Sequence, residues 1–106
     1  MEWITSPAEG LRFDDEQFDC VVSQFGLMYF ENKETAVKEM HRVLKPNGHL
    51  AVLVWDELEN NPGLAAEEYL WQKFLGGEID STPYAMGDSA VLEKLFKPLN
   101  LGDFLI

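Results

Sequence analysis

The sequence predicts one α/β domain, built on a strand-helix-strand unit and completed by further helices. Three segments indicate it: an apolar run from Phe18 to Gln24, an amphipathic stretch over residues 33–45, and a second apolar run over residues 50–55. Two strands joined through a helix within about forty residues are typical of a parallel βαβ unit.

The first strand follows a loop. Residues 7–17 contain proline, glycine and an acidic cluster that interrupt any apolar period, so we expect them to be irregular. Cys20, Val21 and Val22 are then apolar in succession instead of alternating with polar residues. Such a run is typical of a strand that is covered on both faces of a parallel sheet.

The connecting helix begins after Asn32, a residue type that caps helix N-termini well. Apolar residues then recur at helical spacing up to Leu44, which predicts one buried face. Pro46, Asn47 and Gly48 form a turn signal that ends the helix and precedes the second strand.

Two more helices follow the second strand. Asn61 and Pro62 supply a cap and a first helical residue, and the helix that runs to Leu75 is apolar over so much of its circumference that we expect it to pack on two sides. Residues 78–87 form a loop, and Asp88 or Ser89 caps a short helix that ends at Pro98. Residues 101–106 could form a last short strand. No repeat or linker divides residues 1–106, which we interpret as a single domain.

Composition limits the partners. Nineteen acidic residues against eight basic ones give a net charge of −11, which repels phosphate backbones and anionic lipids, so we expect neither a nucleic acid nor a membrane partner. No segment approaches the length of about 20 apolar residues that crosses a bilayer, and the N-terminus lacks the basic start of a secretory signal. A single cysteine, Cys20, fits a reducing compartment, and we expect a cytoplasmic location.

Three stretches together resemble the class I S-adenosylmethionine-dependent methyltransferases, in their small-molecule branch. They are Ala8 to Phe13, Phe18 to Met28 and Glu39 to Gly48, the last containing Arg-Val-Leu-Lys-Pro-Asn-Gly before an apolar strand. The resemblance implies a partial Rossmann-like methyltransferase sheet. In this family the strand order is 3-2-1-4-5-7-6, and the two strands of the chain would be strands four and five.

The resemblance covers only the C-terminal portion of that fold. The glycine-rich loop after strand one and the acidic residue that ends strand two, which hold the cofactor in this family, have no counterpart before Phe18. Gly26 and the Gly76-Gly77 pair follow the wrong elements to replace them. We therefore interpret the chain as a truncated methyltransferase-like domain.

The resemblance also implies where S-adenosylmethionine would be contacted. Ala8 and Glu9 match the stretch after strand three, and Ser23, Gln24 and Phe25 match the end of strand four. Glu9 could instead be a solvated loop acid, and Phe25 could simply be hydrophobic cover for the sheet. Trp55 and Asp56 could border a substrate pocket.

Other kinds of site find no support in the sequence. His41 and His49 have no acid and nucleophile at triad spacing, and the lone cysteine lacks companions for a metal. No catalytic residue can be named.

Two functions remain. The chain could be a non-catalytic methyltransferase-like fragment that self-associates through the exposed core strand Phe18 to Gln24, since an unpaired apolar strand edge tends to pair with another strand. Alternatively, it could be a small-molecule methyltransferase whose cofactor site is completed by another chain, either a second copy or a complementary N-terminal half. The expected partner is therefore a homodimer mate or such a half.

Overall fold

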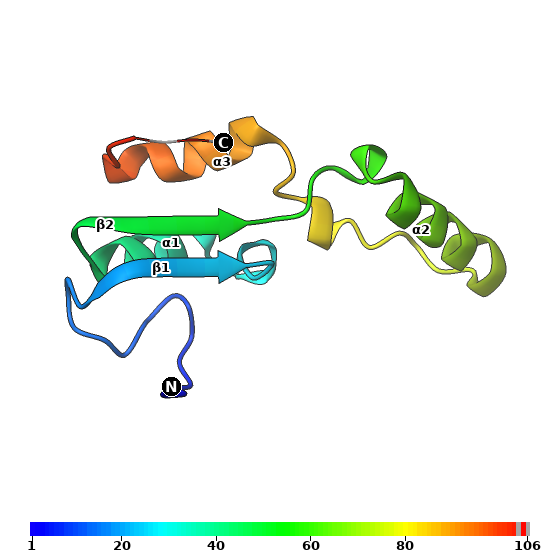
Figure 1. Cartoon of the computed structure of the whole chain (residues 1–106). Helices are drawn as coiled ribbons and strands as arrows, with labels where there is room; N and C mark the ends of the chain where they lie inside the picture. Colours follow the sequence, from blue (N-terminus) through cyan, green and yellow to red (C-terminus); the bar gives the residue numbers. More distant parts are fainter. Residues whose placement is uncertain (104, 106) are drawn as a thin grey trace.

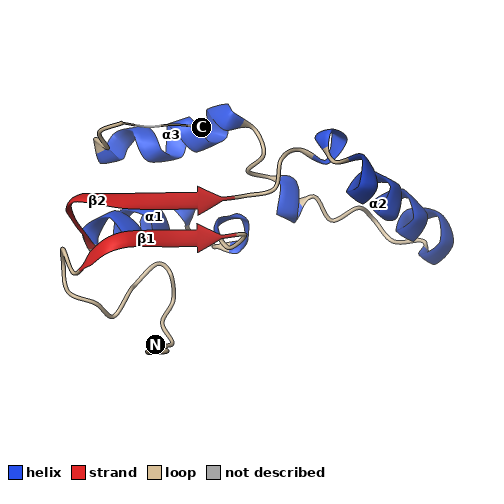
Figure 2. Ribbon diagram, viewed as in Figure 1, coloured by secondary structure: helices blue, strands red, loops and turns tan. Residues whose placement is uncertain are grey.

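The computed structural model describes residues 1–103 and 105 (Figure 1). Two strands, β1 (Phe18–Gln24) and β2 (Leu44–Leu53), are parallel neighbours joined by α1 (Lys33–Arg42). Two helices follow, α2 (Pro62–Leu75) and α3 (Ser89–Phe96), and single 3-10 turns lie between the elements. The predicted strand-helix-strand unit with C-terminal helices is confirmed (Figure 2).

The second strand begins earlier than its apolar run suggests. Phe18 is paired with Leu44 but Cys20 with His49, so β2 carries extra residues that bulge out of the ladder. Asn47 has a left-handed backbone with φ 64° inside this bulge. A Cβ on Gly48 would lie 2.8 Å from the Leu44 side chain, which makes glycine necessary there. The predicted turn is therefore present, but within the strand rather than before it.

Helix α1 is capped as expected, because the Asn32 side chain accepts a 2.9 Å hydrogen bond from the Thr35 backbone N–H. The helix ends at Arg42 with Val43 as its C-cap, three residues before the predicted end, and β2 starts immediately afterwards. Its inner face buries Ala36, Val37 and Met40.

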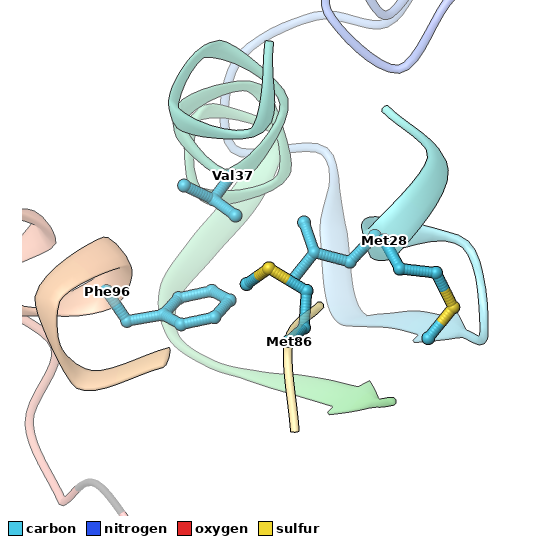
Figure 3. Close-up of a cluster of buried hydrophobic side chains, with 5 residues drawn as sticks. Met28, Val37, Met86 and Phe96 are labelled. Atoms are coloured by element: carbon cyan, nitrogen blue, oxygen red, sulfur yellow. The ribbon is translucent and has the colours of Figure 1, made fainter. Parts of the chain in front are cut away.

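The core lies on one face of the two-stranded sheet, between α1 and α3. Three side chains point toward one another in this core (Figure 3): Val37 of α1, Phe96 of α3 and Met86 of the loop before α3. The strands contribute Leu50 and Val52, which pack against these three side chains. Leu27 and Met28 complete this buried cluster.

The other face of the sheet is open, which corrects the expectation of a strand buried on both faces. Cys20 and Val22 of β1 and Ala51 and Leu53 of β2 are exposed, Val22 to 62%. The apolar run in β1 is thus covered on one side only, and the Cys20 thiol is exposed.

Helix α2 also departs from expectation. It extends away from the sheet beyond the C-terminal ends of the strands (Figure 1) and buries none of its residues, whereas its apolar circumference predicts packing on two sides. The short helix α3 is capped by Asp88, as predicted.

The possible last strand falls partly on Phe104 and Ile106, which lie outside the described residues. Leu101, Gly102, Asp103 and Leu105 are described and do not form a strand.

Candidate functional site

The C-terminal ends of β1 and β2 form the edge at which open parallel sheets bind ligands. Phe25 follows β1 and Trp55 lies two residues beyond β2, and their rings stack with centroids 4.6 Å apart and planes 10° from parallel. The Phe25 N–H donates to the Leu53 carbonyl over 2.9 Å, and this bond holds the Phe25 backbone against β2.

The backbone at Phe25 is unusual. Its φ of 53° lies in the left-handed region, which a bulky side chain rarely adopts. Residues held in such conformations cluster at ligand-binding positions, where the surrounding structure maintains them. Here the conformation turns the chain out of β1 into the 3-10 turn Leu27–Tyr29 and places the ring against Trp55.

Ser23 and Gln24 precede Phe25 and point to opposite faces of the sheet. Ser23 is 8% exposed and lies on the covered face, where its Oγ is 3.4 Å from the position that a Cβ on Gly26 would occupy. Gln24 is exposed on the open face. Gln24 and Phe25 are therefore the members of this stretch that can reach a ligand at the edge.

Ala8 and Glu9 lie apart from this edge, beside the start of α1. Ala8 belongs to a turn closed by the Gly10 N–H donating to the Pro7 carbonyl. The Glu9 carboxylate accepts the Asn32 N–H over 3.3 Å, at the N-terminus of the helix, where a negative charge is favourable. Glu9 thus has a structural partner at the start of α1.

Arg42 holds the rest of this loop. Its guanidinium pairs with both Glu39 oxygens and with Asp15, and it donates to the carbonyls of Leu11 and Phe13. The Arg42 hydrogen bond is the main cause that lowers the pKa of Glu39, and Glu39 in turn is the main cause that raises the pKa of Arg42. The sequence does not reveal the contacts with the loop, because Leu11, Phe13 and Asp15 lie 27 to 31 positions before Arg42.

Beyond β2, Asp56 organises the chain that leads to α2. Its Oδ1 accepts from the Glu57 N–H and from the Asn60 side chain, and the Asn61 amide donates to the Asp56 and Glu57 carbonyls. Desolvation raises the pKa of Glu57, and the nearby carboxylates of Glu59, Asp88 and Asp56 raise it further. Asp56 is thus occupied by its own loop.

An open groove of 1290 Å³ runs between the free edge of β2 and α3. Its walls are mostly apolar at the end near Phe25 and Trp55, and His41, Arg42 and Lys45 lie at the other end. Within residues 1–103 and 105, no three metal-binding side chains come together. No helix there is long and apolar enough to cross a bilayer.

Comparison with known proteins identifies the first half of the chain. Residues 1–52 match the model of the methyltransferase domain. This part of the chain is similar to the methyltransferase domain family. The ubiquinone/menaquinone biosynthesis C-methyltransferase UbiE of Blochmanniella pennsylvanica is 51% identical over 51 residues, which are 48% of this chain and 20% of that protein. Its counterpart in Pseudomonas fluorescens is 45% identical over 60 residues, 57% of this chain and 23% of that protein.

Solved structures extend the likeness to almost the whole chain. A SAM-dependent methyltransferase of Thermotoga maritima, described as a possible histamine N-methyltransferase, superposes with a TM-score of 0.70 at 22% identity over 94% of this chain and 45% of that one. A putative methyltransferase of Bacillus halodurans gives 0.65 at 23% identity over 92% and 44%. The partial Rossmann-like methyltransferase fold is therefore confirmed. The chain spans only about a fifth of the length of the curated relatives that it matches.

The structure places the five residues expected to contact S-adenosylmethionine in two separate groups, Ala8 and Glu9 beside α1 and Ser23, Gln24 and Phe25 at the end of β1. Ser23 is buried on the covered face, and the Glu9 carboxylate accepts the Asn32 N–H. Gln24 and Phe25 remain, with Trp55 beside them. Their aromatic and amide side chains can border a planar group at this edge.

Proposed function

We propose that this chain is a methyltransferase-like portion that does not catalyse alone and that self-associates through the free edge of β1. The observation that carries the proposal is the two-stranded sheet itself, because within residues 1–103 and 105 β1 has a neighbouring strand on one side only. Methyl transfer depends mainly on holding the nucleophile and the sulfonium in line, and a single wall of the site cannot do so.

The free edge of β1 offers hydrogen-bonding groups to another strand. The Phe25 N–H points to β2, so the alternation of a parallel strand directs the N–H groups of Val22 and Gln24 outward. Unpaired edges of this kind recruit a further strand.

Val22→Pro removes one outward donor, and we expect it to lower the mass that equilibrium sedimentation reports. Val22→Thr keeps the N–H and the branched shape and serves as the control. A wild-type chain that is monomeric at micromolar concentration contradicts self-association, and an unchanged mass in Val22→Pro contradicts the use of this edge.

A second candidate function is supported by the stacked Phe25 and Trp55 rings at the ligand-binding edge. In it, the chain is a small-molecule S-adenosylmethionine-dependent methyltransferase whose cofactor site another chain completes. The names of the relatives point to carbon in one case and nitrogen in another as the methylated atom, so the proposal specifies a small molecule only.

Calorimetric titration with S-adenosylmethionine separates the two candidates. We expect no heat of binding from the purified chain up to millimolar cofactor. Saturable heat that disappears in Trp55→Ala would favour the second candidate and contradict the first. Trp3→Ala is the matched control, because Trp3 is 87% exposed in the N-terminal segment.

A further inference from the structure

The chain exposes more surface than a compact protein of its size. Its accessible area is 7848 Å² for 12.1 kDa, against about 6,000 Å² for a folded monomer of that mass. Its radius of gyration is 16.2 Å, against about 13 Å for a compact domain of this length. The excess is about twice the roughly 800 Å² per partner that a stable interface buries.

Two exposed apolar surfaces contribute to this excess. The first is a stripe on α2 formed by Leu70, Trp71, Phe74 and Leu75, which are between 51% and 72% exposed and lie together because they are spaced three and four residues apart. The second is the open sheet face formed by Cys20, Val22, Ala51 and Leu53. Within the part of the chain that the structure describes, the stripe on α2 packs on no sheet, and the open sheet face is covered by no helix.

We infer that α2 of one copy docks on the open sheet face of a second copy, and that the second copy returns the same contact. The inference rests on the self-association proposed above and concerns a second surface, the open sheet face beside the β1 edge. A sheet face is stably buried by an amphipathic helix packed on it.

The dimensions of the two surfaces agree. Fourteen residues make α2 about 21 Å long, and seven residues make β1 about 23 Å long. The molecule is 50 Å long, with the sheet toward one end and α2 toward the other (Figure 1). A two-fold axis perpendicular to this length therefore brings each α2 over the other sheet.

A second copy is the occupant that uses both surfaces at once. Such an exchange is isologous and closes at two copies, leaving neither the stripe nor the open face exposed. The charge of −11 disfavours a lipid surface or a nucleic acid as the occupant.

Trp71→Ala tests the stripe, and Tyr69→Ala is its control. Both aromatic residues are 56% exposed, but Tyr69 lies off the stripe, beside Lys73. Alanine preserves the helix in both variants. By sedimentation we expect Trp71→Ala to raise the dissociation constant about tenfold or more, as the loss of a buried tryptophan does, and Tyr69→Ala to leave it within about twofold.

The only cysteine of the chain reports on the sheet face. Cys20 is exposed in the isolated chain. In the associated state, α2 of the partner copy should cover Cys20 and slow its reaction with a thiol reagent. We expect Trp71→Ala to restore fast reaction and Tyr69→Ala, which lies off the stripe, to leave the protection in place. A monomeric wild type, or equal effects of Trp71→Ala and Tyr69→Ala, overturns the inference. A wild type that associates while Cys20 stays fully reactive also overturns the inference, and it leaves the β1 edge as the interface.

Discussion

Gly87 lies where the chain before α3 passes the exit of β2, and no other residue fits there. A Cβ at this position would be 2.3 Å from the Glu57 nitrogen and 2.6 Å from the Asp56 carbonyl carbon. These are backbone atoms and cannot turn aside as a flexible side chain could. The sequence analysis places Gly87 in a loop, and nothing local to that loop reveals the crossing, because its partner residues lie thirty positions earlier.

We therefore expect Gly87→Ala to destabilise the fold by about 2 kcal/mol, a usual cost of overpacking. Urea unfolding followed by circular dichroism measures the effect. Gly63→Ala is the control, since a Cβ there meets nothing within 4 Å and alanine favours the helix. Equal stability of Gly87→Ala and the wild type would show that the two segments do not touch.

At the level of elements, the sequence predicts what local residues determine and misses what pairing determines. The start of α1 is predictable because Asn32 and Thr35 make the cap between them. The start of β2 is not, because the bulge at Asn47 exists only in relation to the pairing with β1. Met86 contributes to the core from a polar loop, where a single apolar residue gives no periodic signal.

The candidate site divides in the same way. The sequence names Gln24 and Phe25 correctly as residues at the end of a parallel strand, since strand direction alone places them there. It cannot show that Ser23 turns to the covered face or that the Glu9 carboxylate is used at α1. Both facts depend on three-dimensional neighbours.

The Glu39–Arg42 pair anchors residues 11–15 to α1. Its contribution to the free energy of unfolding should depend on pH. The pKa of Glu39 lies below its ordinary value of 4.5 in the folded chain. The stabilisation is therefore fully present above pH 4.5 and is lost as the pH falls through the lower folded value. We expect the urea midpoint of Glu39→Gln to be lower than that of the wild type at neutral pH and to change less on acidification.

Glu93→Gln on α3 is the control for this effect, because the Glu93 side chain is exposed. It should retain the pH profile of the wild type. Parallel acid profiles for wild type and Glu39→Gln would contradict the role of the pair.

At the scale of the whole molecule, charge opposes association. Two copies bring together twice the charge of −11, and salt screens this repulsion over about 10 Å at 0.1 M. We expect the dissociation constant of the self-associated chain to fall as sodium chloride rises, which sedimentation at several salt concentrations measures. Weaker association at high salt would indicate an interface that relies on ion pairs instead of apolar burial.

The lack of buried side chains in α2 should let this helix unfold locally more often than the packed helices. A helix of 14 residues without buried side chains is close to the length at which isolated helices are marginal in water. Its amide hydrogens should therefore exchange with deuterium much faster than those of α1, whose inner face is packed. Docking of α2 on another surface would slow this exchange along the whole helix. The amide exchange rate of α2 therefore reports whether the helix is packed or free in solution.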